Sequence, residues 1–184
     1  MWPSRDLAFV IIIAVATFVY STLIGQLGNL ITGIHGFNYL FIIGHAIFLS
    51  FGFLIYEGRR WRLLLQGIVG AFLTLATALS GTPFDHISKI PMILNSFFGD
   101  LIFNSLYSLF KKRNKLVWLA IIVALGFVLM MPLYVSLNMF LFYPPQALSM
   151  YISVYLLLFP VTIVETVIGG YLGFRIYERV KTIQ

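Results

Sequence analysis

The chain has 184 residues, of which 60% are hydrophobic and only 10% are charged. A soluble domain carries about a quarter charged residues, and a domain of this size must cover its outside with polar side chains. The composition therefore excludes a soluble enzyme, a nucleic-acid-binding domain and a disordered chain, and it predicts a multi-pass protein of the cell membrane. In a membrane protein, the net charge of +6 is explained first by basic loops beside the lipid bilayer, and only then by binding to nucleic acid.

Six apolar stretches follow one another along the chain, separated by polar or turn-forming breaks. A membrane-spanning helix needs about 20 residues, and roughly 17–25 are tolerated. The sequence therefore predicts one all-α transmembrane domain over residues 1–184, a bundle of six transmembrane helices. The predicted spans are 7–24, 39–55, 63–79, 90–110, 116–137 and 150–177.

The basic residues alternate between the breaks. Eleven of the 12 Lys and Arg lie at the N-terminus, in the breaks after the second and fourth spans, and after the sixth. The connections after the first, third and fifth spans hold only Lys89. Cytoplasmic loops collect Lys and Arg, so this pattern predicts that both termini are cytoplasmic.

Two carboxylates, Asp100 and Glu165, lie inside predicted spans. Each costs about 2.5–3.5 kcal/mol at mid-membrane on insertion scales, so each is expected to face the bundle interior or water. Two interpretations stay open. The pair either lines a site for a ligand or an ion, or forms a hydrogen-bonded contact between helices.

Other polar residues of the outer half are candidates for a small-molecule pocket beneath the outer connections. Asn29 and Asn138 lie in the first and third of these connections, and Asn95 lies above Asp100. Tyr151 and Tyr155 are one turn apart and present one aromatic face. Together with Asp100 and Glu165, these five residues form the predicted ligand-binding set.

No motif supports catalysis. The chain has no cysteine, no Walker loop, no HExxH and no Gly-x-Ser-x-Gly, so we expect neither an enzyme nor a bound cofactor. The three histidines are His35, His45 and His86, and no two have the i, i+4 spacing of a helical metal site. We therefore assign no metal site.

Several segments give the chain a family resemblance. It resembles the substrate-binding S components of energy-coupling factor (ECF) vitamin transporters, and the Gly-Asn loop leans toward the thiamine and pyrimidine-precursor branch. The segments that carry the resemblance are Arg5-Asp6-Leu7-Ala8, Gly28-Asn29-Leu30 with Gly33 and Gly36, Arg59-Arg60-Trp61, Gly67 to Gly70, Gly99-Asp100-Leu101-Ile102, and Glu165 with Gly169-Gly170 and Gly173.

The resemblance implies a non-enzymatic subunit that captures a vitamin or vitamin precursor from outside. It implies a membrane coupling protein and two ATPase subunits as partners, besides the lipid bilayer, and no nucleic acid. An alternative stays open. The fourth and fifth spans, with Lys111 to Lys115 between them, are also similar to part of the A subunit of archaeal ammonia monooxygenase. That alternative is a core or non-catalytic subunit of a membrane-bound enzyme complex such as a copper-dependent monooxygenase.

Overall fold

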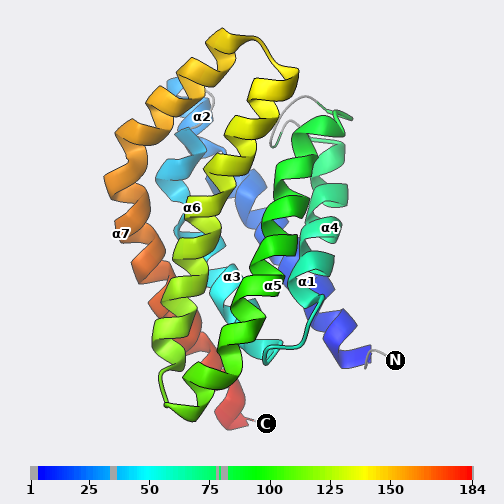
Figure 1. Cartoon of the computed structure of the whole chain (residues 1–184), viewed down its shortest axis with the longest axis vertical. Helices are drawn as coiled ribbons and strands as arrows, with labels where there is room; N and C mark the ends of the chain where they lie inside the picture. Colours follow the sequence, from blue (N-terminus) through cyan, green and yellow to red (C-terminus); the bar gives the residue numbers. More distant parts are fainter. Residues whose placement is uncertain (1–3, 34–36, 78, 80–82, 184) are drawn as a thin grey trace.

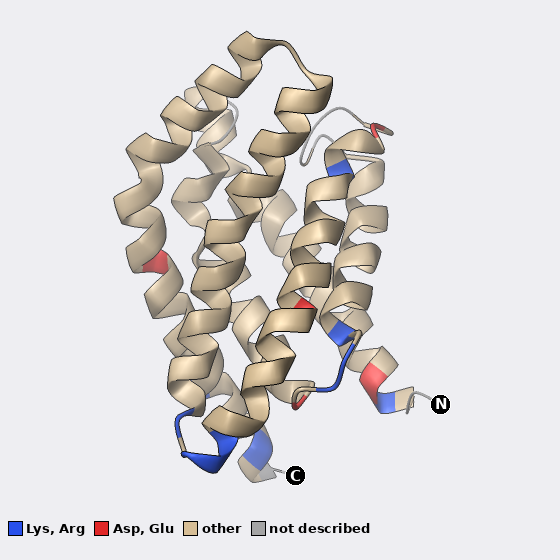
Figure 2. Ribbon diagram, in the orientation of Figure 1, with Lys and Arg blue, Asp and Glu red and all other residues tan. Residues whose placement is uncertain are grey.

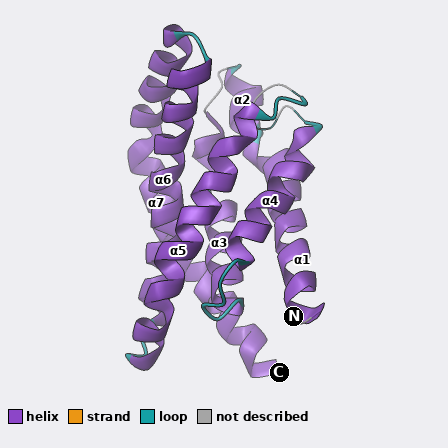
Figure 3. Cartoon of the chain, turned by 45° about the vertical axis from the view of Figure 1, so that its right-hand side comes forward, coloured by secondary structure: helices purple, strands orange, loops and turns teal. Residues whose placement is uncertain are grey.

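The computed structural model describes residues 4–33, 37–77, 79 and 83–183, and every regular element in these ranges is a helix. The all-α helical bundle predicted from the sequence is confirmed (Figure 1). Figure 3 shows the loops confined to the ends of the bundle. The elements are α1 (Ser4–Tyr20), η1 (Ser21–Gly25), α2 (Leu27–Thr32), η2 (Phe37–Phe41), α3 (Ile43–Ile55), α4 (Arg62–Leu75), η3 (Ile87–Lys89), α5 (Ile90–Lys112), α6 (Leu116–Phe142) and α7 (Pro145–Ile183).

The first helix runs farther than predicted. α1 continues through the π-helical segment η1 into α2, so residues predicted as the start of a loop are helical. The Asn29 side chain, which favours turns when it bonds its own backbone, instead contacts Gln26 and the backbone nitrogen of Asn38. The helix ends at Gly33, which adopts the left-handed conformation (φ 69°) that glycine permits.

The second predicted span is divided into two pieces. The 3-10 segment η2 precedes α3, and the break falls at Ile42. Glu165 Oε2 in α7 accepts hydrogen bonds from the backbone nitrogens of Ile42 and Ile43, at 2.9 and 3.2 Å. A helix that starts inside the bundle has unpaired N–H groups, and Glu165 satisfies two of them.

A tight turn joins α3 to α4. Glu57, Gly58 and Trp61 all have positive φ, at 53°, 72° and 71°. Asp100 of α5 accepts hydrogen bonds from the backbone nitrogens at the start of α4, beginning with Trp61 at 2.8 Å. α4 then ends at Leu75, four residues before the predicted end of its span.

The last three helices, α5, α6 and α7, have 23, 27 and 39 residues. α5 begins with Pro91 in its first turn, where a missing N–H costs nothing. α6 and α7 contain Pro132 and Pro160 in their interiors. The break predicted over 138–149 shortens to Tyr143 and Pro144, because α6 runs five residues beyond its predicted end and α7 starts five residues before its predicted start.

The helices pack side by side in the order α1, α4, α5, α6 and α7, and α3 connects α7 back to α1 while also contacting α6. Glycine sets the α3–α7 contact. A Cβ at Gly169 would lie 2.6 Å from Ala46 Cβ, and one at Gly173 would lie 2.7 Å from the carbonyl oxygen of Ile47. These two glycines therefore serve packing within the chain, as small residues four apart do in membrane helices.

Both termini lie at the same end of the bundle, where most of the Lys and Arg also gather (Figure 2). We call this the basic end. The opposite end holds η3, with the buried amine of Lys89 2.7 Å from the carbonyl oxygen of Leu79. The charge separation expected from the sequence is thus present in space.

Among the described residues, three helical stretches are long and apolar enough to cross a membrane, namely Ser4–Thr32, Leu116–Phe142 and Pro145–Thr182. α3 and α4 are apolar but shorter. Large apolar side chains such as Leu30, Phe72 and Leu157 are about 70% exposed on the outside of the bundle. A surface of this kind belongs in lipid, and the protein is therefore associated with a membrane.

The loops at the opposite end are held by hydrogen bonds. Tyr143 OH donates to Asp85 Oδ2 at 2.5 Å, and Asp85 Oδ1 accepts from the backbone nitrogens of Ile87 and Ser88. The hydrogen bond from Tyr143 is the main cause that lowers the pKa of Asp85 below its usual value. Burial, together with that bond, raises the pKa of Tyr143 to about 12.

Candidate functional site

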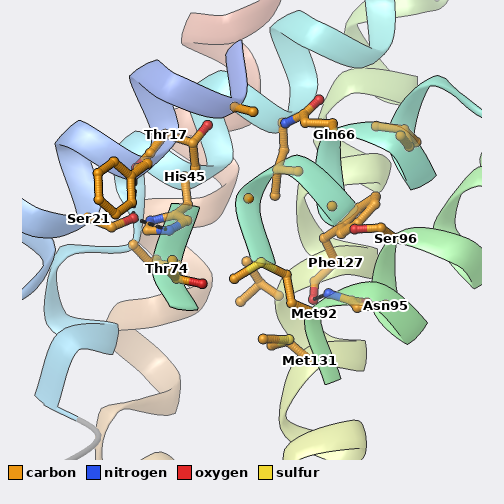
Figure 4. Close-up of a pocket in the computed structure, with 18 of the residues that line it drawn as sticks. Thr17, Ser21, His45, Gln66, Thr74, Met92, Asn95, Ser96, Phe127 and Met131 are labelled. Carbon is orange, nitrogen blue, oxygen red and sulfur yellow. Dashed lines mark hydrogen bonds between the residues drawn. The ribbon is translucent and has the colours of Figure 1, made fainter. Parts of the chain in front are cut away.

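A cavity of about 180 Å³ lies inside the bundle between α1, α3, α4, α5 and α6 (Figure 4). Its walls combine apolar side chains, among them Met92, Phe127 and Met131, with several polar ones. None of the residues described in its lining is Lys, Arg, Asp or Glu. Its polar side chains include Thr17, Ser21, His45, Gln66, Asn95 and Ser96.

His45 projects from the first turn of α3 and contacts α1. Its Nε2 lies 2.9 Å from Ser21 Oγ, and the Ser21 hydroxyl itself donates to the carbonyl oxygen of Thr17 at 2.7 Å. A hydroxyl has one proton, so Ser21 accepts from His45 and the imidazole proton is on Nε2. Nδ1 is then a lone-pair acceptor, and it is buried without a hydrogen-bond partner.

Ser21 is in place because the helix changes its pitch there. It opens the π-helical segment η1, directly after α1. Segments of this kind recur at functional sites, since the wider turn shifts side chains around the helix axis. The adjacent Tyr20 ring packs edge-on against His45 with centroids 5.9 Å apart, and its hydroxyl donates to the carbonyl oxygen of Phe41.

Asn95 enters the cavity from α5 and is only 6% exposed. Its Nδ2 donates to the backbone carbonyl oxygen of Phe127 in α6 at 3.1 Å, which fixes the orientation of the amide. The other amide atom, Oδ1, is buried and has no partner. Asn95 thus has the same property as His45: a buried acceptor without a donor.

Gln66 of α4 completes the polar wall and is also 6% exposed. Its Oε1 accepts a hydrogen bond from Tyr56 OH at 2.9 Å, so the remaining polar groups of the amide are N–H donors. Gly67, one residue farther along, brings α4 and α5 together, because a Cβ there would lie 2.4 Å from Ser96 Cβ.

Of the seven ligand-binding residues predicted from the sequence, Asn95 lines this cavity and the other six lie outside its lining. Asp100 is 1% exposed and binds the start of α4. Its Oδ2 accepts from the backbone nitrogens of Leu63 and Leu64 at 2.9 and 3.2 Å, while Oδ1 also accepts from Asn104 at 2.5 Å. The geometry is that of a helix cap supplied by another helix.

Glu165 has the corresponding place at the start of α3, as described above. Two interpretations were left open for Asp100 and Glu165. In the structure, each of them forms a hydrogen-bonded contact between helices. The two carboxylates accept from backbone N–H groups. A sequence pattern does not reveal such partners, because almost every residue carries a backbone N–H.

The remaining predicted residues join the loops and helices of the opposite end. Asn138 Nδ2 donates to the carbonyl oxygen of Ile87 at 3.0 Å. The hydroxyl oxygens of Tyr151 and Tyr39 form one hydrogen bond at 2.8 Å. The Tyr155 ring packs edge-on against the Tyr39 ring, with centroids 5.3 Å apart. Asn29, as noted, joins α2 to the residue that follows Phe37.

The sequence-based prediction of the site missed His45, Gln66, Ser21 and Ser96. Gln66 carried a usable signal, since a polar side chain inside an apolar span is expected to face the bundle interior. His45 carried the same signal. Ser21 gave none, because the change of helix pitch that presents it has no sequence marker.

Within the described ranges, no three His, Cys, Asp or Glu side chains come together in a group that would hold a metal ion. His45 lines the cavity and His86 is exposed at the opposite end. His35 lies outside the described residues.

A second cleft, of about 380 Å³, lies at the basic end between the start of α1 and the end of α7. Asp6, which is 7% exposed, is bonded there by Arg59 at 2.6 Å and by Arg62 at 2.8 Å. The Asp6 carboxylate is the main cause that raises the pKa of Arg59. This ion cluster connects α1 to the α3–α4 turn.

Comparison of the chain with known protein families, with curated proteins and with solved structures found no match.

Proposed function

We propose that the chain is a membrane-embedded substrate-binding subunit of an uptake system, similar in role to the S components that its sequence resembles. It captures a small vitamin-like molecule from outside the cell and passes it to a membrane coupling protein driven by two ATPase subunits. The chain itself performs no chemistry. Six spans in the cell membrane, with both termini cytoplasmic, complete the proposal.

The cavity between the helices is the observation that carries the proposal. Ligand sites are concave and mostly apolar, with a few placed polar groups, and they occur between the helices of bundles. The cavity has this composition, and it is formed by five helices rather than by one loop. Two buried acceptors on its walls lack donors, which is costly in a structure unless a ligand or water supplies them.

The charge distribution supports the orientation. The basic end contains Arg60 and Lys111, and cytoplasmic loops are the ones that collect Lys and Arg. The opposite end, whose described residues include Lys89 as their one Lys or Arg, then faces outward. The Lys89 amine is buried and donates to the carbonyl oxygen of Leu79.

The test is to measure ligand binding in protein purified gently in detergent. Native mass spectrometry is expected to detect a retained small molecule, and calorimetric titration with thiamine, its pyrimidine precursor and other vitamins is expected to show binding of at least one of them. Purification from native membranes is expected to recover ATPase subunits with the chain. Folded protein that retains no molecule and binds none of these vitamins would contradict the proposal.

A matched pair of variants locates the site. Thr17 lines the cavity, whereas Thr22 is exposed on the outside of the same helical stretch, and each hydroxyl donates to the carbonyl four residues earlier. Thr17→Leu fills part of the cavity and is expected to abolish binding. Thr22→Leu makes the same chemical change outside the cavity and is expected to leave binding intact.

A further inference from the structure

The geometry points to the chemical class of the ligand: a neutral molecule of about one ring that presents two hydrogen-bond donors, one to His45 Nδ1 and one to Asn95 Oδ1. This inference rests on the proposed function, because it assumes that the cavity binds a small molecule. The ligand must offer hydrogen-bond donors, and the protein atoms that accept them are His45 Nδ1 and Asn95 Oδ1.

Both unpartnered atoms are acceptors. The bond chain from His45 to Ser21 to Thr17 uses the single imidazole proton on Nε2, which leaves Nδ1 with a lone pair. Asn95 spends an N–H on the carbonyl oxygen of Phe127, which leaves Oδ1. Among the described residues, four buried side-chain atoms lack a partner, and two of them, His45 Nδ1 and Asn95 Oδ1, belong to residues that line the cavity.

The two acceptors approach the cavity from different helices, α3 and α5. The terminal torsions of His and Asn side chains are broad, so small rotations bring these atoms to a donor inside the cavity. A ligand with two N–H or O–H groups therefore connects the two walls. A ligand without donors would leave both acceptors unsatisfied, at a free-energy cost for each.

The lining also excludes charge. An ion in an apolar membrane interior needs a counter-charge, and no described residue of the lining supplies one. Size sets a further limit. A cavity of about 150 Å³ holds benzene, so the 180 Å³ here admits one substituted ring. Met92, Phe127 and Met131 offer the apolar surface that such a ring contacts.

The test uses two pairs of probes that match in shape and differ in donors. Benzamide has two N–H groups, and in acetophenone a methyl group replaces the amide nitrogen. Resorcinol has two O–H groups, and 1,3-difluorobenzene has none. At least one donor-bearing probe is expected to bind about 5-fold or more tightly than its partner, as one net hydrogen bond predicts.

Variants identify the acceptors. His45→Phe and Asn95→Leu each keep the approximate shape and remove one acceptor, so each is expected to weaken the donor-bearing probe by about 5- to 150-fold. Neither is expected to change binding of the donor-free partner. His86→Phe, at an exposed position outside the cavity, is the matched control.

A measurement on the unchanged protein guards against variants that do not fold. In protein with ¹⁵N-labelled histidine, the Nδ1 resonance of His45 is expected to shift when a donor-bearing probe binds, and to stay when the donor-free partner is added. Equal affinity within both pairs, a stationary Nδ1 resonance, or no binding of either donor-bearing probe would overturn the inference. A retained natural ligand that is charged or lacks donors would also overturn it, while the proposed binding function would stand.

Discussion

Asp100 Oδ2 in α5 lies 2.9 Å from the backbone nitrogen of Leu63, in the first turn of α4. Glu165 of α7 has the same relationship to Ile43 in the first turn of α3. Two helices of this bundle thus begin on a carboxylate that belongs to another helix. The negative charge also complements the positive end of the helix dipole, which explains why two acidic residues are kept inside an apolar bundle.

Loss of the Asp100 cap is expected to lower stability and leave ligand affinity unchanged. Asp100→Ala leaves the backbone nitrogens of Trp61, Leu63 and Leu64 without their acceptor. We expect the free energy of unfolding to fall by roughly 1–3 kcal/mol, with a lower Tm in detergent. Asn104→Ala, which removes a donor to the same carboxylate, is expected to have a smaller effect. An unchanged Tm together with abolished binding would show that Asp100 contacts the ligand instead.

Loss of the Glu165 cap is expected to loosen the start of α3 locally. Glu165→Leu removes the acceptor for Ile42 and Ile43, so hydrogen exchange at these two amides should accelerate about 2- to 30-fold, corresponding to a cap worth 0.5–2 kcal/mol. Glu178→Leu is the control, because Glu178 is half-exposed near the end of the same helix. Equal exchange rates in the two variants would contradict the capping role.

The α3–α7 contact should not tolerate a methyl group at Gly173. The added Cβ would lie 2.7 Å from the carbonyl oxygen of Ile47, a backbone atom that cannot move aside alone. We expect Gly173→Ala to destabilise the fold by about 1–3 kcal/mol. Gly70→Ala is the matched control, since its nearest neighbour is the flexible Met92 Sδ at 3.3 Å. Thermal unfolding that ranks the two variants in the reverse order would refute the packing argument.

The loops at the opposite end are expected to loosen in acid. Because the folded state lowers the pKa of Asp85, its contribution is fully present above the ordinary value of 3.8 and is lost as the pH falls through the lower folded value. The backbone N–H groups of Ile87 and Ser88 donate to Asp85 Oδ1, so hydrogen exchange at these two amides reports the loss. Tyr143→Phe removes the main cause of the lowered pKa.

In that variant we expect the exchange at Ile87 and Ser88 to accelerate at a higher pH than in the unchanged protein. Tyr171→Phe, at an exposed position on α7, is the control and should keep the original pH dependence. Identical pH profiles in the two variants would mean that Tyr143 does not set the pKa of Asp85.

Orientation is testable because the chain has no cysteine of its own. Arg60→Cys places a thiol at the basic end and His86→Cys places one at the opposite end, both at exposed positions. A membrane-impermeant maleimide added to intact cells is expected to label the position at 86 and not the position at 60. Labelling at both, or at 60 alone, would reverse or refute the proposed topology.

The sequence predicted the helical character and the order of the main segments because each one carries its own apolar run. It predicted their ends less well. Gly28 and Asn29 favour a turn by composition, yet they are helical, because Gly28 allows Phe37 to approach closely and Asn29 bonds across to Asn38. Tertiary contacts of this kind override local preference.

The candidate site was predicted only in part, and for a related reason. Asn95 was identified because it lies above Asp100 in the same apolar span. Asp100 and Glu165 were included in the predicted ligand-binding set while a contact between helices stayed open, and their partners are backbone N–H groups of α4 and α3. Which faces of five helices meet around one cavity depends on packing, and the position of His45 there follows from the break at Ile42.

The break at Ile42 also bears on how the protein is made. Glu165, whose carboxylate accepts the hydrogen bond from the Ile42 amide, lies 123 residues farther along the chain. During synthesis α3 therefore exists before its cap does, and the amides of Ile42 and Ile43 have no Glu165 to bind until the last helix is made. A nascent chain that stops before α7 lacks the group that caps α3.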